Sequence, residues 1–342
     1  MASSGAGATT GGTGAGGHGA VGGTGTGGSF DDDGGMQCGL QTFDLVRKPA
    51  DLFLVLDRSA SMEDGNDGNA ATATSPSKWS QVIPAVTMAV SATDSDVSWG
   101  LKTFPEDGSE CAASTVSTKI DVPVAAMNAT AVNAAVNGTT DAGNGTPTAS
   151  AIKVAFNYLN GLNDGANKFI LLATDGEPSC TAALVKDTTQ AHTDAVAAVT
   201  AAAAGGVKTF VVGVATTKPN DAMTLNDMAV AGGEAQPNPN PLATKFYLSE
   251  SQTDLVNAIK AITGQISSCT FPLSMPPPVP AHIAVKVSGV KAPQDTMHLD
   301  GWDYTDGTFT AVQVYGSWCD MIKNAAANMV TIIFGCADII PT

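Results

Sequence analysis

Acidic and hydroxyl side chains follow each other at short spacing in residues 51–62, DLFLVLDRSASM. Asp57, Ser59 and Ser61 are each two residues apart, directly after a run of five apolar residues. Carboxylate and hydroxyl oxygens without histidine or cysteine suit a hard cation such as Mg²⁺ or Ca²⁺. The spacing therefore predicts a divalent-cation site, and the alternative is a polar turn or a helix cap.

Two further segments carry the same kind of oxygen. Residues 143–148, GNGTPT, offer Thr146 and Thr148 ahead of an expected helix, and either threonine could face the ion. Residues 169–178, FILLATDGEP, contain a second apolar run that is followed by Asp175. A site with few carboxylates and several neutral hydroxyls leaves its cation incompletely neutralised. We therefore expect it to bind an outside carboxylate rather than simply to store metal.

Alternating strands and helices are expected to position these residues. An unbroken apolar run is typical of a strand buried on both faces, as in a parallel sheet, and open α/β sheets bind ligands at the carboxyl ends of their strands. We expect strands over residues 52–57, 97–104, 168–174, 207–214 and 245–249. We expect helices over residues 78–92, 147–160, 187–204, 221–231 and 251–267. This alternation predicts an α/β fold with a mostly parallel sheet and helices on both faces.

The three motifs DRSASM, GNGTPT and ATDGEP together resemble the von Willebrand factor A (vWA) domain and its metal-ion-dependent adhesion site (MIDAS). The resemblance covers about residues 45–268 and implies a Rossmann-like fold. It implies that Mg²⁺, or alternatively Ca²⁺ or Mn²⁺, is held at the upper face of the sheet. The implied ligands are Asp57, Ser59, Ser61, Thr146 and Asp175. A protein partner that supplies Asp or Glu to the metal is implied as well.

The chain is expected to have three parts. Residues 1–37 are rich in Gly, Thr and Ala and read as a flexible leader, because they cannot bury enough apolar surface to fold. Residues 38–269 form the expected vWA domain, in which the polar segment 63–77 is an insertion that forms a loop near the site. Residues 270–342 follow as a small disulfide-stapled β-rich module, after a proline-rich linker.

Six widely spaced cysteines contain no CxxC pair, which favours disulfides from an oxidising compartment over a zinc or thioredoxin-like motif. One pair follows two strands at the same sheet edge and would brace the rim of the site. A second would join the ends of the vWA domain, which the resembling fold brings close together, and a third would staple the small module. The expected disulfides are Cys111–Cys180, Cys38–Cys269 and Cys319–Cys336.

The net charge of −16 argues against a nucleic-acid partner, which favours a basic surface. No apolar run is long enough for a transmembrane helix, and no signal sequence is visible. We expect an exported protein, extracellular, periplasmic or at the cell surface, that the leader could tether to a surface. The absence of nucleophile, metalloprotease and phosphate-loop motifs predicts a binding protein, not an enzyme. The alternative is a structural envelope or filament component in which the vWA domain is a metal-stabilised scaffold.

Overall fold

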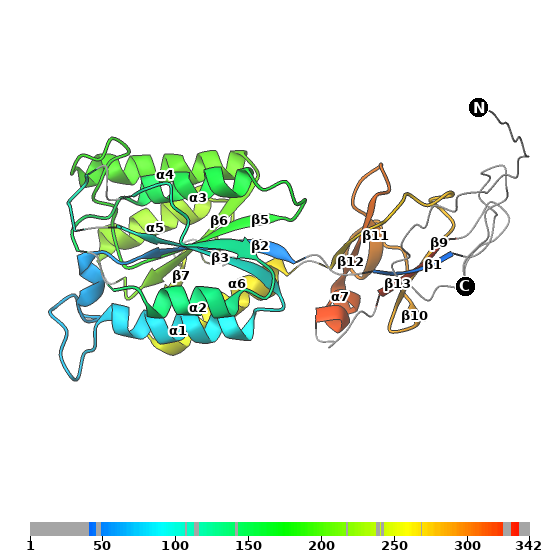
Figure 1. Cartoon of the computed structure of the whole chain (residues 1–342), viewed down its shortest axis with the longest axis horizontal. Helices are drawn as coiled ribbons and strands as arrows, with labels where there is room; N and C mark the ends of the chain where they lie inside the picture. The colour runs from blue at the N-terminus through cyan, green and yellow to red at the C-terminus, as the bar shows by residue number, and fades with distance from the viewer. Residues whose placement is uncertain are drawn as a thin grey trace, which may run out of the picture.

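The chain contains a larger α/β unit and a small β-rich module (Figure 1). The leader predicted over residues 1–37 lies outside the part of the chain that is described. Among the described residues, no helix is both long and apolar enough to cross a membrane. The computed structural model describes residues 41–45, 49–106, 108–112, 116–140, 143–216, 218–236, 240, 243–267, 269–323 and 330–334.

A six-stranded sheet forms the centre of the α/β unit, with strand order β4-β3-β2-β5-β6-β7. Only β4 runs antiparallel to its neighbour. All residues of β2 and β3 are buried, and for β2 the unbroken apolar run predicts this. The strands are β2 (Ala50–Asp57), β3 (Val97–Phe104), β4 (Val122–Ala125), β5 (Lys168–Thr174), β6 (Val207–Val214) and β7 (Tyr247–Ser249).

Helices cover both faces of this sheet (Figure 1). One face carries α1 (Lys78–Ala92), α2 (Ala129–Asn137) and α6 (Gln252–Ile266). The opposite face carries α3 (Thr148–Asn160), α4 (Thr188–Ala204) and α5 (Pro219–Ala231). Successive side chains of a strand point to opposite faces, so β2 supplies Leu54 to one core and Phe53 to the other. The predicted α/β class is confirmed.

Two antiparallel sheets form the small module, with strand orders β1-β13-β9-β10 and β11-β12-β8. Their shared core contains Phe271, Trp302 and Ile332. One helix, α7 (Gly316–Lys323), lies against β12. The strands are β1 (Gln41–Leu45), β8 (Thr270–Pro272), β9 (Ile283–Val287), β10 (Val290–Lys291), β11 (Gly301–Tyr304), β12 (Ala311–Tyr315) and β13 (Val330–Phe334).

The predicted start of the vWA domain at residue 38 is wrong. Strand β1 belongs to the small module, where it pairs antiparallel with β13, with Gln41 opposite Phe334. The central sheet of the α/β unit begins only at Ala50. Without β1, the backbone of β13 would be exposed along one side, and an open strand edge is a liability that proteins cover. The small module is therefore assembled from both ends of the described chain.

Candidate metal centre

The predicted ligands come from three segments that meet at the carboxyl ends of the parallel strands. Strand β2 ends at Asp57, and the short 3₁₀ helix η1 (Ala60–Glu63) follows it. Asp175 comes directly after β5, the parallel neighbour of β2. Thr146 lies two residues before the start of α3. We call this side of the sheet the carboxyl edge and the opposite side the amino edge.

Hydrogen bonds connect four of the five predicted ligands in pairs. The Ser61 hydroxyl donates to Asp175 Oδ1 at 2.9 Å, across 114 residues of sequence. The Ser59 and Ser61 hydroxyl oxygens are 3.1 Å apart, and the Ser59 N–H donates to Asp57 Oδ1 at 2.8 Å. Thr174, which the sequence reasoning did not single out, donates its hydroxyl to Asp57 Oδ2 at 2.5 Å. The side chains of two distant loops thus converge on one spot.

The glycine-rich turn brings Thr146, the fifth residue, to the same place. An open pocket of about 450 Å³ is lined by Thr146 together with Ser61 and Asp175. Thr148 is fully buried at the start of α3 and does not line this pocket. Of the two threonines that the sequence left open, Thr146 is the one that faces the pocket.

Hydrogen bonds hold the turn against the first motif on one side and against the segment after Asp175 on the other. The Ala60 N–H donates to the Gly143 carbonyl at 2.8 Å, and the Thr146 N–H donates to the Ser179 hydroxyl at 2.8 Å. Gly143 and Gly145 have φ angles of +90° and +84°, which residues with a side chain rarely adopt. The glycines therefore permit the turn that carries Thr146 to the pocket.

The charges at the carboxyl edge are poorly balanced. Asp57 is fully buried, and this burial, followed by repulsion from the nearby Asp175 carboxylate, raises the pKa of Asp57 from 3.8 to about 7. The hydrogen bonds from Thr174 and Ser59 only partly oppose that increase. A buried carboxylate beside a second one is an arrangement that a cation would relieve. Two carboxylates and three hydroxyls are also oxygen donors of the kind that Mg²⁺, Mn²⁺ and Ca²⁺ prefer, so these residues fit a hard divalent ion.

Lys78 is a part of the site that the sequence reasoning missed. Its ammonium donates to Asp175 Oδ2 at 2.7 Å and to the Ser61 carbonyl at 3.2 Å, and only 7% of its side chain is exposed. The sequence places this lysine at the first position of an amphipathic helix, 21 residues after Asp57, and nothing in its neighbours marks it as inward-facing. The contact with Asp175 exists only in the folded chain.

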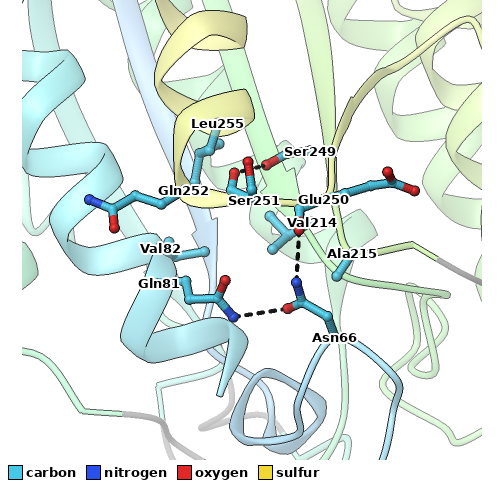
Figure 2. A pocket seen from close by; sticks show the side chains of 10 residues that line it. All are labelled: Asn66, Gln81, Val82, Val214, Ala215, Ser249, Glu250, Ser251, Gln252 and Leu255. Atoms are coloured by element: carbon cyan, nitrogen blue, oxygen red, sulfur yellow. Dashed lines mark hydrogen bonds between the residues drawn. The ribbon is translucent and has the colours of Figure 1, made fainter. Parts of the chain in front are cut away.

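The polar insertion over residues 63–77 forms a loop beside the site, as expected. Bridges between Asp64 and Ala70 and between Gly65 and Ser77 fold the loop back on itself. Figure 2 shows Asn66 between α1 and the segment after β7, bonded to the Gln81 side chain at 2.9 Å and the Glu250 carbonyl at 2.8 Å. The hollow around Asn66 measures about 10 Å³, roughly room for one water, so it is a joint rather than a ligand pocket.

One predicted disulfide is confirmed and two are wrong. Cys111 and Cys180 form a disulfide next to the glycine-rich turn, where a Cβ on Gly145 would lie 3.0 Å from the Cys180 sulfur. Cys269 pairs with Cys319 inside the small module, which excludes both Cys38–Cys269 and Cys319–Cys336. Strand β8 pairs with β12 and thereby brings the residues before β8 close to α7. Cys38 and Cys336 lie outside the described residues.

Sequence comparison decides the family. The profile of the von Willebrand factor type A domain matches residues 51–261, more than half of the chain. The chain belongs to the von Willebrand factor type A domain family. Among curated proteins, no sequence matches significantly.

Solved structures with a vWA-like fold share little sequence with this chain. The pilus adhesin SpaC from Lactobacillus rhamnosus GG is 15% identical, with a TM-score of 0.48, and the match covers 86% of this chain and 40% of SpaC. A point mutant of the minor pilin PilB from Streptococcus sanguinis is 14% identical, with a TM-score of 0.50. That match covers 65% of this chain and 62% of PilB. This vWA chain thus spans less than two thirds of either protein.

A third similar structure is described with metal. Proximal thread matrix protein 1 from the mussel byssus, with zinc in its MIDAS motif, is 14% identical, with a TM-score of 0.45. That match covers 67% of this chain and 51% of the byssus protein. At these identities and TM-scores no role can be taken from these proteins, and the role of the vWA domain in this chain must be argued from its own residues.

Proposed function

We propose that this protein is a metal-dependent binding protein that captures an acidic side chain of a protein partner. The proposed ion is Mg²⁺, with Mn²⁺ or Ca²⁺ as alternatives. The observation that carries the proposal is the 2.9 Å hydrogen bond from Ser61 to Asp175, because it joins the two halves of the motif. The proposed ligands are Asp57, Ser59, Ser61, Thr146 and Asp175.

The chemistry of this donor set favours binding over metal storage. Asp57 is fully buried and Ser59 and Asp175 are nearly so, whereas Ser61 is exposed at the mouth of the pocket. The ion, when bound, supplies an electrophilic centre whose positive charge the neutral hydroxyls do not cancel. The rigid strand ends orient the ligands, and the open pocket admits a carboxylate from outside. This division of roles supports capture of an Asp or Glu side chain.

The wider biological setting is part of the same proposal. Disulfides such as Cys111–Cys180 and Cys269–Cys319 are typical of oxidising compartments, which supports an extracellular, periplasmic or cell-surface location. SpaC is described as a pilus adhesin and PilB as a minor pilin, and an adhesive role at a surface is the corresponding proposal here. We propose binding without catalysis, with the leader over residues 1–37 as a flexible tether.

A capture experiment tests the proposal. Immobilised protein is incubated with surface extracts in Mg²⁺ or in EDTA, and the wild type is compared with Asp57→Asn. We expect a partner that is retained by the wild type in Mg²⁺ and lost in EDTA or with the variant. Asp164→Asn, which removes an aspartate charge at the amino edge, is the matched control and should retain the partner. Capture that survives both EDTA and Asp57→Asn would instead support the structural-scaffold alternative.

A further inference from the structure

A buried lysine at a proposed cation site needs an explanation. The Lys78 ammonium contacts Asp175 Oδ2 at 2.7 Å, with side-chain exposures of 7% and 2% for the two residues. Removing an ammonium and a carboxylate from water carries a large desolvation cost, which good geometry only partly offsets. A cation in the first turn is also opposed by the helix dipole, and Lys78 is the first residue of α1. Helix formation alone does not account for a lysine at this position.

The two oxygens of Asp175 have different partners. Oδ1 accepts the Ser61 hydroxyl at 2.9 Å, and Oδ2 accepts the Lys78 ammonium at 2.7 Å. Oδ1 lies beside the Ser61 hydroxyl, so it is the Asp175 oxygen that would remain available to an ion held there. Lys78 can therefore keep its own oxygen when an ion is bound, so that the ammonium and the ion need not exclude each other.

The insertion loop holds Lys78 in this position. The Lys78 N–H donates to the Asp64 carbonyl at 2.9 Å, and the preceding residue, Ser77, caps α1 and forms a bridge with Gly65. Asn66 then fixes the loop to α1 and to the segment after β7 (Figure 2). The loop thus has a structural consequence for the site, because it determines where the ammonium lies.

We propose that Lys78 is a fixed counter-ion of Asp175 that keeps the carboxyl edge folded without metal and lowers the affinity of the site for a divalent cation. The inference rests on the proposed metal site. With both aspartates ionised, a divalent ion would cancel their two negative charges. Counted over the ion, these two carboxylates and Lys78, one positive charge then remains, which a partner's carboxylate can neutralise. Asp64, Glu177, Asp221 and Lys218 line the same pocket and are outside this count. Lys78 therefore weakens binding of the ion and strengthens binding of the partner's carboxylate.

Charge-removing variants test this role. Lys78→Met and Lys78→Gln are titrated with Mg²⁺ by calorimetry, and their melting temperatures are measured in EDTA and in Mg²⁺. We expect Mg²⁺ affinity to increase by about tenfold or more, because a positive charge near the ion is lost. In EDTA, we expect each variant to melt several degrees below the wild type, and saturating Mg²⁺ should restore most of that loss. Lys78→Gln keeps a hydrogen-bond donor and serves if Lys78→Met does not fold.

A matched lysine at the other end of β5 provides the control. Lys168 pairs with Asp164 at 2.7 Å, lies 3.9 Å from the buried Asp51 carboxylate and is 12% exposed. Lys168→Met should leave Mg²⁺ affinity within twofold of the wild type, and Mg²⁺ should not preferentially rescue its stability. Unchanged or weaker Mg²⁺ binding by both Lys78 variants would overturn the inference. Failure of the metal site itself has a different result, since neither the wild type nor any variant would then bind Mg²⁺.

Discussion

Two aspartates at opposite edges of the central sheet, Asp164 and Asp57, have pKa values that are shifted in opposite directions. At the amino edge, partial burial of Asp164 favours a higher pKa, but hydrogen bonds from Lys168 and the Ala166 N–H outweigh it and lower the pKa to about 2. At the carboxyl edge, burial and the Asp175 carboxylate raise the pKa of Asp57 to about 7. Asp164 is thus held in its ionised form by nearby donors, whereas ionised Asp57 is buried against a second carboxylate. A cation would relieve the environment of Asp57, and Asp164 has no corresponding need.

The largest expected effect on stability comes from removing the Cys111–Cys180 disulfide at the carboxyl edge. The Cys111→Ser/Cys180→Ser double variant opens a loop of 69 residues, which corresponds to roughly 4 kcal/mol of unfolding free energy in the chain-entropy model. The turn with Thr146 also loses its support, so Mg²⁺ affinity should fall about tenfold. Urea unfolding and calorimetric titration measure the two effects. The Cys269→Ser/Cys319→Ser variant is the control: it should also be less stable, but bind Mg²⁺ like the wild type.

The pH dependence of Asp57 gives the second effect. Its raised pKa means that the metal-free fold loses stability as pH rises from about 4 to about 7, because the buried carboxylate must ionise in the folded state. In EDTA at pH 8, Asp57→Asn should be more stable than the wild type by a few kcal/mol, and at pH 4 the two should be similar. Mg²⁺ should reverse the order at pH 8. Thermal unfolding measures this, and a wild-type advantage in EDTA at pH 8 would show that Asp57 is not destabilised.

Two glycines, one at each edge, have similar backbone conformations but different amounts of space around them. Gly145 at the carboxyl edge has φ +84°, and an added Cβ would meet the Cys180 sulfur at 3.0 Å. Gly206 at the amino edge has φ +85° and open space around it. Both alanine variants should lose about 1–2 kcal/mol from backbone strain. Only Gly145→Ala should also weaken Mg²⁺ binding, and an equal loss of Mg²⁺ affinity in Gly206→Ala would contradict the proposed role of the turn.

The smallest effect is expected at the amino edge. The Asp164 side chain is 40% exposed, so solvent screens its pair with Lys168. Asp164→Asn should change the unfolding free energy by only about 0.5 kcal/mol and leave Mg²⁺ affinity unchanged. Chemical denaturation and calorimetry are the measurements. A loss of several kcal/mol would mean that the two edges differ less than their environments indicate.

Local patterns in the sequence were enough to predict the α/β architecture. The unbroken apolar runs of β2 and β5 identify buried parallel strands, and the polar residues after them identify the carboxyl edge. The short edge strand β4 was missed, because four residues of mixed burial carry little pattern. Residues 41–45 were not predicted as a strand and were placed in the wrong unit, because the partner of β1, β13, lies almost 300 residues further along the chain.

The candidate site shows the same limit. The spacing of the motif residues identifies the site in the sequence. The positions of Cys111 and Cys180 after two strands likewise indicate their pairing. Lys78 does not, because an exposed lysine and an inward-facing one look alike at the start of a helix. The Cys269–Cys319 pairing depends on how β8 docks on β12, which no local pattern specifies. Local sequence patterns thus do not predict the contacts between distant segments.

Calorimetric titration of Mg²⁺ into metal-free wild type and Asp57→Ala at pH 7.5 tests the central claim most directly. The account predicts saturable binding of one ion by the wild type and none by the variant, whose fold is verified by circular dichroism. Equal Mg²⁺ affinity in the two proteins would contradict it.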